Sequence, residues 1–362
     1  MDRLRYKARG ALSNPDGRYE SMRHEAFEDG WESFEETPRT IPVTVLPDKA
    51  KTVINYNKSP DVWFDRSINP YRGCEHGCIY CFARPTHSYW GLSPGLDFET
   101  QLFYKDNAVD RLIEELDKPG YQCKPIALGI NTDAYQPLER TKKLTRQLLE
   151  VLLEYKHPVS LITKSQLIVR DIDLLEKFAK DDLVSVMVSI TSLDNKIIKS
   201  ALEPRAASAA KRLEVIRSLT AAGIPVGVMV APVIPFVTDA ELEKILQAAF
   251  DAGAKEAGYV LLRLPHEVKD LFRQWLEEHY PDKAAHVMSL IRQSQNGKDY
   301  NPEWGTRMRG TGQYAELLAQ RFSNAYRRIG FSSGNMPEMN TGLFGSPQAR
   351  GKESVKQLSL PF

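Results

Sequence analysis

Short apolar runs alternate with longer amphipathic segments through the middle of the chain. The runs are nearly continuous in hydrophobic residues, which is the pattern of strands buried on both faces of a parallel sheet. They cover residues 125–130, 159–163, 183–190, 226–233 and 258–264. Apolar residues at helical spacing cover 108–116, 144–155, 171–178, 208–222 and 240–252. Gly223 and Gly253 follow the last two of these segments, at the position where helices commonly end. The alternation predicts an α/β fold in which helices cover a parallel sheet.

The number of strand–helix units predicts the type of barrel. Five strands are evident, and a further one is expected just before residue 74, which suits a partial (β/α)6 TIM-like barrel better than a full eight-unit barrel. Helical spacing returns over 267–279, 283–293 and 312–328. We therefore predict a polar, flexible N-terminal arm over 1–58, the partial barrel over 59–265, a helical C-terminal extension over 266–331 and a flexible tail over 332–362.

Composition and charge are those of an ordinary globular enzyme. Hydrophobic residues make up 42% of the 362-residue chain and charged residues 26%. The 48 basic residues nearly balance the 47 acidic ones, so any surface that attracts a polyanion must be local. No apolar run is long enough to span a membrane, and the N-terminal residues lack the apolar core of a signal peptide. We expect a cytoplasmic protein with no membrane association.

Three of the four cysteines lie within eight residues, at Cys74, Cys78 and Cys81. A secreted disulfide protein would spread and pair its cysteines, so this tight, odd-numbered cluster indicates a metal site. Four thiolates normally hold a cubane iron–sulfur cluster, and three leave one iron open to a further ligand. Gly73 and Gly77 supply the conformational freedom that a loop around a cluster needs.

A structural zinc site with His76 as fourth ligand is the alternative for this loop. It requires His76 to turn inward from between two cysteines, and zinc sites usually bring a second ligand pair from further along the chain. Cys123 is the remaining cysteine, and nothing near it resembles a second pair. We predict that Cys123 is a buried thiol.

The C-x3-C-x2-C loop, at the front of a β/α array, resembles that of the radical SAM superfamily. The resemblance implies a 4Fe–4S cluster held by Cys74, Cys78 and Cys81, with S-adenosylmethionine bound to the open iron. In that family one electron cleaves S-adenosylmethionine to methionine and a 5′-deoxyadenosyl radical, which abstracts hydrogen from the substrate, while the protein supplies position and electrostatics. An electron donor such as flavodoxin or ferredoxin is then expected as a partner.

Several later segments resemble the spore photoproduct lyase family, whose radical SAM enzymes reverse a thymine dimer in DNA. Their order and spacing match over about half of the chain, at 131–133, 161–164, 188–190, 202–204, 211–214 and 225–232. The resemblance implies that Thr132, Lys164 and Ser189 contact S-adenosylmethionine from the ends of predicted strands, where β/α folds bind ligands. Lys164 can pair with the methionine carboxylate.

Three further residues are candidates for the cofactor pocket. Tyr80 lies where the family packs an aromatic ring near the adenine, and Asp133 and Glu203 are weaker pocket candidates. The alternatives are a packing role for Tyr80, a solvated strand-end position for Lys164 and a helix-capping role for either carboxylate. No residue is assigned a catalytic role.

Two departures from the lyase pattern matter for the reaction. The lyase returns a hydrogen atom to its product from a cysteine three residues before the equivalent of Asp133, where this chain has Ile130. A tyrosine after the third cluster cysteine joins that relay, and here Phe82 takes its place. Neither side chain has a labile hydrogen atom to donate. The chain therefore resembles relatives of the lyase rather than the lyase itself, and thymine-dimer reversal by that route is not expected.

Two segments suggest a nucleic-acid partner. Residues 357–362, from Gln357 to Phe362, resemble the peptide by which bacterial proteins dock on the replication sliding clamp; a tail packed on its own domain is the alternative. Residues 304–312 carry arginines among an aromatic residue and glycines, a pattern that suits phosphate and base contacts. The basic and aromatic residues of this hint are Trp304, Arg307, Arg309, Arg321, Tyr326, Arg327 and Arg328, and the alternative is an ordinary basic helix face.

We predict a radical SAM enzyme that cleaves S-adenosylmethionine reductively at a 4Fe–4S cluster and acts on nucleic acid, with DNA repair or modification as the expected role. The first alternative is a radical SAM enzyme acting on RNA, a peptide or a metabolite. The second is a cluster-bearing binding module that does not turn over.

Overall fold

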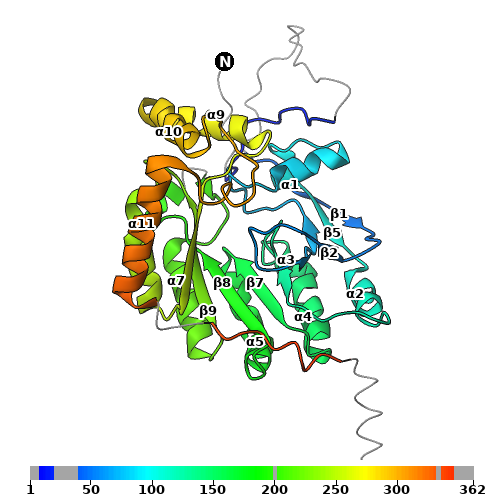
Figure 1. Ribbon diagram of the computed structural model, residues 1–362. Helices are drawn as coiled ribbons and strands as arrows, with labels where there is room; N and C mark the ends of the chain where they lie inside the picture. Colours follow the sequence, from blue (N-terminus) through cyan, green and yellow to red (C-terminus); the bar gives the residue numbers. More distant parts are fainter. Residues whose placement is uncertain (1–7, 20–39, 199–201, 332–335, 346–362) are drawn as a thin grey trace, which may run out of the picture.

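Parallel strands at the centre of the fold confirm the predicted partial barrel. The computed structural model describes residues 8–19, 40–198, 202–331 and 336–345 (Figure 1). The large sheet has the order β10-β9-β8-β7-β6-β3-β2, and every pairing is parallel except that of β2 with β3. Its strands are β2 Ile54–Tyr56, β3 Arg66–Ile68, β6 Ile126–Leu128, β7 Val159–Thr163, β8 Val184–Ser189, β9 Val226–Val233 and β10 Glu256–Leu261. Five of them, β6 to β10, are the strands expected from the apolar runs, and β3 lies where a further strand was expected before residue 74.

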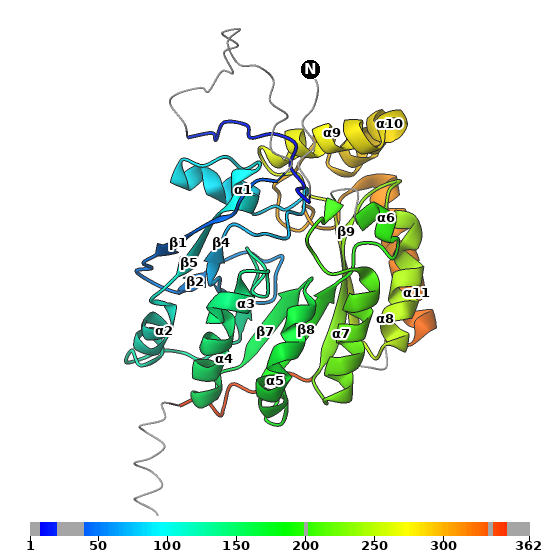
Figure 2. The ribbon, with the colours of Figure 1, turned by 180° about the vertical axis from the view of Figure 1, so that it is seen from behind.

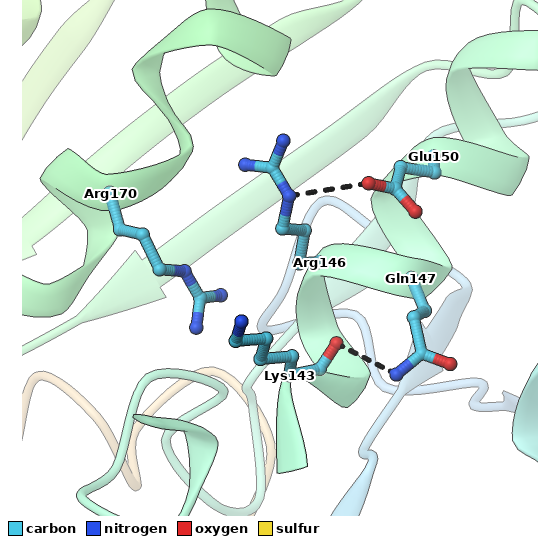
Figure 3. Close-up of a pocket in the computed structure, with 5 residues that line it drawn as sticks. All are labelled: Lys143, Arg146, Gln147, Glu150 and Arg170. Atoms are coloured by element: carbon cyan, nitrogen blue, oxygen red, sulfur yellow. Dashed lines mark hydrogen bonds and ion pairs between the residues drawn. The ribbon is translucent and has the colours of Figure 1, made fainter. Parts of the chain in front are cut away.

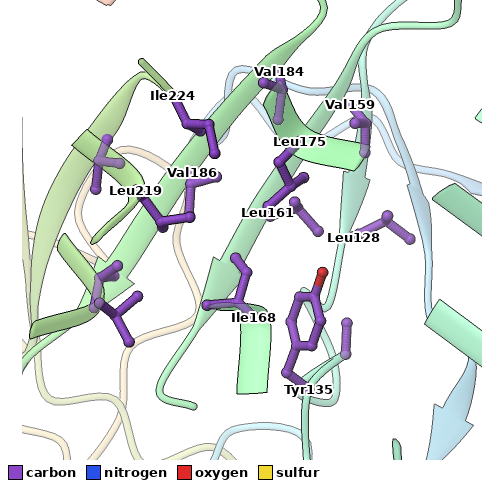
Figure 4. Packing of buried hydrophobic residues seen from close by; sticks show 14 of the residues in the cluster. Leu128, Tyr135, Val159, Leu161, Ile168, Leu175, Val184, Val186, Leu219 and Ile224 are labelled. Atoms are coloured by element: carbon purple, nitrogen blue, oxygen red, sulfur yellow. The ribbon is translucent and has the colours of Figure 1, made fainter. Parts of the chain in front are cut away.

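Helices between these strands cover the outer face of the sheet, and Figure 2 shows α4, α5 and α7 side by side there. The covering helices are α2 Ala108–Leu116, α4 Leu144–Glu154, α5 Ile172–Ala179, α7 Ala209–Ala221 and α8 Leu242–Asp251. In the core shown in Figure 4, Leu161 and Val186 of the strands meet Leu175 and Leu219 of the helices, all at most 2% exposed. Removal of so much apolar surface from water is the main force that holds helices to sheet.

A second, three-stranded sheet was not predicted. It has the order β1-β5-β4, with β1 Thr44–Asp48 parallel to β5 Gln101–Lys105 and β4 Tyr71–Arg72 antiparallel to β5. We call it the accessory sheet. The 3-10 helix η1 Arg84–Trp90 and the short helix α1 Asp97–Thr100 lie between β4 and β5 in sequence. Both β1 and β2 come from the segment predicted as part of an N-terminal arm, so residues 44–56 belong to the sheets of the body.

The first described residues are also built into the body. The side chains of Arg9 and Ala11 are 4% and 0% exposed, and the hydroxyl of Ser13 donates to Gln274 Oε1 at 2.7 Å. Pro15 O accepts a 2.6 Å hydrogen bond from the Ser93 hydroxyl. This segment therefore packs between the cysteine region and the C-terminal helices, although its polar composition predicted a flexible arm.

The C-terminal extension is helical, as predicted, with α9 Val268–His279, α10 Pro281–Ser294 and α11 Gly312–Ile329. Between α10 and α11 the chain crosses the end of β10, where Leu261 N donates to Met308 O at 2.9 Å. The remaining short helices are α3 Glu139–Lys142, η2 Gln166–Asp171, α6 Asn195–Ile197 and η4 Asp239–Glu241. No helix in the described part of the chain is long and apolar enough to cross a membrane.

Part of the predicted flexible tail packs on the barrel. Asn340 N donates to Asp182 O and Gly345 N to Tyr155 O, so residues 340–345 cross the amino ends of β7 and β8 (Figure 1, red). The ring of Phe344 lies 5.4 Å from those of Tyr121 and His157. The Gly- and Ser-rich composition predicted an irregular, flexible segment. In the structure the Phe344 ring packs against aromatic side chains of the barrel and holds residues 340–345 in place. The suggested clamp-binding residues 357–362 lie outside the described residues.

Candidate functional site

The cysteine loop follows β4 and is shaped by two glycines. Gly73 and Gly77 have φ of +71° and +66°, the left-handed region that side-chain-bearing residues rarely adopt. A Cβ on Gly77 would meet Glu99 Oε2 at 2.7 Å, so space as well as conformation requires glycine there. Cys74 and Cys78 are buried, Cys81 is half-buried, and all are free thiols.

A buried ion pair supports this loop from behind. The guanidinium of Arg84 donates to the carbonyls of Gly77 and Cys78 at 3.0 and 2.9 Å and pairs with Glu99 at 2.5 Å, and neither charged side chain is exposed. Glu99 also accepts 3.0 and 2.9 Å hydrogen bonds from the backbone amides of Gly10 and Ala11. Because a buried pair is stable only when its polar atoms are satisfied, these bonds fix the loop's shape.

The donor arrangement fits a cluster better than a single metal ion. Among the described residues, no three His, Cys, Asp or Glu side chains are grouped to hold one ion. The thiolates of a cubane bind different irons and lie further apart than the ligands of one zinc ion. His76, the fourth ligand in the zinc alternative, has its Nδ1 3.3 Å from Asp133 Oδ2 instead. The geometry therefore argues against the zinc alternative.

The three thiols are neutral until a metal replaces their protons. Burial and the nearby Glu203 carboxylate raise the pKa of Cys78 to about 12. Burial likewise raises the pKa of Cys74 and of Cys81. A buried thiolate is stable only beside positive charge, which iron supplies as it displaces the protons.

Asp133 joins the ends of β6 and β7 to the cysteine loop. Its carboxylate accepts hydrogen bonds from the Thr163 hydroxyl and the Lys164 amide, both at 2.8 Å, as well as facing His76. Burial alone would raise the pKa of Asp133, but the His76 ring and the hydrogen bonds from the Lys164 and Tyr135 amides lower it to about 2. Beside it, the Thr132 hydroxyl donates to Tyr71 O at 2.9 Å.

Glu203 is the centre of a second buried network. Its carboxylate accepts hydrogen bonds from Tyr80, from Arg212 and, at 2.6 Å, from Thr191. Arg212 also donates to Ser189 O at 3.0 Å, which ties the network to the end of β8. Burial opposes ionisation, but the Arg212 and Lys164 charges and the hydroxyl hydrogen bonds lower the pKa of Glu203 to about 2. The carboxylate is thus a fixed negative charge.

The structure brings all six predicted cofactor residues together beside the cysteine loop. The ammonium of Lys164 lies 5.9 Å from the centre of the Tyr80 ring, between the two networks. Thr132 follows β6, Lys164 follows β7 and Ser189 ends β8, so they share the carboxyl edge of the sheet. Asp133 and Glu203 each accept hydrogen bonds from several donors of the protein itself.

A cleft of about 730 Å³ opens next to this region. Phe82 and Ile130, the positions at which the lyase has its hydrogen relay, both line it. Asp48 is the one acidic residue among its described lining residues, whereas six are basic: Lys49, Lys51, Arg72, Lys105, Arg263 and Arg307. A chain with a net charge of only +1 has therefore concentrated positive charge at one cavity.

The predicted basic segment is only partly at this cleft. Arg307 lines it and forms an ion pair with Asp61, while Trp304 is 60% exposed. Arg309 instead lies over the Tyr259 ring at 4.2 Å. Arg321 pairs with Glu243 at 2.8 Å, and Tyr326 stacks on Phe331; Arg327 and Arg328 are exposed. These last four residues belong to α11, and none of them lines the cleft.

Sequence reasoning missed several residues that build the site. Arg84 and Glu99 carry no sequence signal, because only the folded chain shows that they are buried together. Arg212 lies in one of the segments that resemble the lyase, so that match was a usable signal. Lys105 and Arg72 were missed because the accessory sheet that carries them was not predicted.

A second cavity, of about 400 Å³, lies on the outside of the barrel and contains none of the predicted site residues (Figure 3). Its arginines are paired with carboxylates: Arg146 with Glu150 at 3.2 Å and Arg170 with Glu139 at 2.7 Å. We assign it no role.

Known proteins are similar to this chain over the region that carries the cysteine loop. The sequence matches the Radical SAM superfamily over residues 68–249, half of the chain, a range that includes the cysteine loop and all six cofactor candidates. An uncharacterised protein of Mycobacterium tuberculosis is 36% identical over 231 residues, which cover 63% of this chain and 68% of that protein. An uncharacterised protein of Methanocaldococcus jannaschii is 29% identical over 240 residues, 66% of this chain and 85% of that protein.

The fold is similar to that of spore photoproduct lyase. A cysteine-to-serine variant of the lyase superposes with a TM-score of 0.54 at 15% identity, over 81% of this chain and 80% of that one. A variant with bound AdoMet and dinucleoside spore photoproduct gives the same TM-score at 14% identity and the same coverage. At this identity the similarity shows the fold alone. The family match and the arrangement of the cysteine loop together show that the chain belongs to the radical SAM superfamily, whose enzymes use a 4Fe–4S cluster and S-adenosylmethionine.

Proposed function

We propose that Cys74, Cys78 and Cys81 hold the cluster and that the substrate, bound in the adjacent cleft, is a nucleic acid, with DNA as the expected form. The single observation that carries the substrate class is the charge of the cleft, whose described lining has six basic residues and one acidic residue. A concentration of basic side chains attracts the phosphate backbone of a nucleic acid. It gives no favourable electrostatic interaction with a neutral or cationic peptide.

Of the six cofactor residues, four would contact S-adenosylmethionine and two would hold those four in place. We assign Tyr80, Thr132, Lys164 and Ser189 to contacts with S-adenosylmethionine, with the Lys164 ammonium on its carboxylate. Asp133 and Glu203 act through these residues, because their carboxylates already accept hydrogen bonds from Lys164 N and from Tyr80. When bound, cluster and S-adenosylmethionine together supply a radical that removes a hydrogen atom from the substrate.

Exposed aromatic rings at the cleft favour a nucleic acid over a small anion. Phe82 and Trp90 line the cleft and are 44% and 45% exposed, although large aromatic side chains are usually buried. Bases stack on such rings while basic residues follow the phosphates. The lyase with a bound dinucleoside photoproduct has the same fold, which is consistent with this assignment without establishing it.

The identities of Phe82 and Ile130 set this reaction apart from that of the lyase. Both line the cleft, and no cysteine is among its described lining residues. Tyr71, the one tyrosine among them, donates its hydroxyl hydrogen to the buried carboxylate of Glu139. We therefore infer that the product does not regain hydrogen from a thiol of the cleft wall.

The test is anaerobic reconstitution with iron and sulfide, followed by dithionite and S-adenosylmethionine, with 5′-deoxyadenosine measured by chromatography. Wild type and Cys123→Ala should form it, because Cys123 lies away from the loop, and Cys81→Ala should not. Single-stranded and duplex oligonucleotides should bind the reconstituted enzyme. Cleavage of S-adenosylmethionine without binding of DNA or RNA would leave a radical SAM enzyme with another substrate; no cleavage above Cys81→Ala would favour the non-catalytic module.

We also propose that residues 357–362 bind the sliding clamp and that a flavodoxin or ferredoxin supplies the electron. A chain that ends at residue 356 should lose binding to purified clamp while still cleaving S-adenosylmethionine. Clamp binding that survives this truncation would end the proposal.

A further inference from the structure

Lys105 is a buried lysine at the wall of the cleft. It is the last residue of β5, its Cα pairs with that of Asp48 across the accessory sheet, and it is 5% exposed. Among the described residues, no side chain forms a hydrogen bond or an ion pair with its ammonium. Its Nζ is not among the fully buried polar atoms, so the ammonium opens onto the cleft, where an anionic ligand can reach it.

The carboxylates nearest to Lys105 are engaged elsewhere. Asp48 Oδ2 accepts a 2.7 Å hydrogen bond from Arg72 Nε. Glu115 accepts hydrogen bonds from the backbone amides of Val53 and Ile54 at 2.6 and 3.2 Å. Burial and the repulsion of Arg72, only partly offset by Asp48 and Glu115, lower the pKa of Lys105 to about 8. The protein's own charges therefore leave this site short of negative charge.

Arg72 is held in a fixed orientation beside it. Its guanidinium carbon lies 4.4 Å from the centre of the Trp90 ring, and Trp90 stacks on Phe103 at 5.6 Å. Arg72, Lys105 and Trp90 all line the cleft. A stacked guanidinium loses little freedom when its remaining N–H groups meet an oxyanion. Two neighbouring cations at a cavity wall, of which only Arg72 is paired with a carboxylate, are a ready site for an anion.

We propose that Lys105 and Arg72 bind one phosphate of a nucleic-acid strand that enters the cleft along the accessory sheet. The inference rests on the proposed function and deepens it, because it assigns a particular subsite to the strand's backbone. Lys49 and Lys51, which follow β1 and also line the cleft, extend the positive charge from this subsite toward solvent.

The first experiment measures how the affinity for a labelled single-stranded oligonucleotide depends on salt, by fluorescence anisotropy with the full-length reconstituted protein. Lys105→Met should weaken binding about tenfold or more and reduce the slope of log K against log salt by about 0.7, the value for one phosphate on a single strand. Lys105→Arg should retain most of the slope. Lys211→Met, which removes an exposed lysine on α7, is the matched control and should leave both values unchanged.

The second experiment locates the contact without relying on a variant. Reductive methylation with formaldehyde, read by mass spectrometry, should modify Lys105 in the free protein and modify it several-fold less with the oligonucleotide bound. Lys211 should react equally in both states. Inorganic pyrophosphate at the same phosphate concentration should protect Lys105 much less than the strand does.

The outcomes separate this subsite from the proposed function. If wild type binds no oligonucleotide, the nucleic-acid assignment itself fails. If wild type binds and Lys105→Met matches it in affinity and slope, with Lys105 equally methylated in both states, the subsite is wrong while the function stands. Protection by pyrophosphate equal to that by the strand would assign the subsite to a small phosphate compound and overturn the proposal.

Discussion

Buried charged side chains beside the cysteine loop are paired, whereas most of the described basic side chains in the cleft are not. Beside the cysteine loop, Arg84 and Arg212 are fully buried and each pairs with a buried glutamate. In the cleft, Lys49, Lys51, Lys105 and Arg263 form no ion pair among the described residues, and Arg263 Nε has no hydrogen-bond partner. Buried ion pairs hold the surrounding backbone in one geometry before any ligand binds. Unpaired cationic side chains remain free to attract an anionic ligand. The cofactor region is thus built for position and the cleft for capture.

The largest expected effect comes from breaking the buried ion pair of Arg84 and Glu99. Arg84→Met leaves the Glu99 carboxylate buried without its counter-charge and removes the donors to the Gly77 and Cys78 carbonyls. Breaking a buried pair in this way should lower the free energy of unfolding by about 3–5 kcal/mol, measured by urea denaturation of the metal-free protein. Iron bound per chain after reconstitution should fall with it.

Lys211→Met is the control for this prediction, because its pair with Glu214 is exposed and such pairs contribute little to stability. Arg84→Met protein with the stability and iron content of this control would mean that the loop keeps its shape without the buried pair. The contrast between the two regions would then lose its basis.

The sequence predicted the barrel well because the barrel is built from local patterns. Five of the expected strands were nearly continuous apolar runs, and burial on both sides of the sheet leaves few other choices of residue. The accessory sheet was not predicted because β1 contains a proline, has no buried residue and lies beside a polar segment. Its pairing with β5 joins residues more than fifty positions apart, which no local pattern records.

The candidate site was likewise predictable only in part. The cysteines and the cofactor candidates could be found because they lie within short segments with recognisable spacing. The cleft could not, because Arg72, Lys105 and Arg263 become neighbours only through three separate strands or strand ends. The near-zero net charge of the chain also concealed a strongly basic cavity.

A smaller effect should follow from a new negative charge in the cleft. Thr52 is exposed and lines the cavity, so Thr52→Asp should weaken oligonucleotide binding several-fold at low salt, with the difference fading as salt screens the charge. Stability should be nearly unchanged, because no buried group is altered. Gln247→Glu, on the exposed face of α8, adds the same charge elsewhere and should change binding less than twofold. Equal effects of the two variants would show that attraction comes from overall charge rather than from the cleft.

The smallest effect concerns acid and a third region, the amino edge of the sheet. His157 is fully buried against Phe344, and burial lowers its pKa to about 4. Because the folded value lies below the unfolded value of about 6.5, the stabilisation is complete above pH 6.5 and is lost as the pH falls toward 4. Between pH 7 and 5.5 this one group should cost about 1 kcal/mol of unfolding free energy, whereas Glu203, with a pKa of about 2, should still be ionised.

His157→Gln tests this assignment, because glutamine has no charge to gain in acid. The variant should show a weaker fall in unfolding free energy between pH 7 and 5.5 than wild type, whatever its stability at pH 7. The same variant should leave oligonucleotide affinity unchanged, since His157 lies at the opposite edge of the sheet from the cysteine loop. An unchanged pH dependence would place the acid sensitivity at another group, but not at Asp133 or Glu203, whose pKa values of about 2 keep both carboxylates ionised over this range.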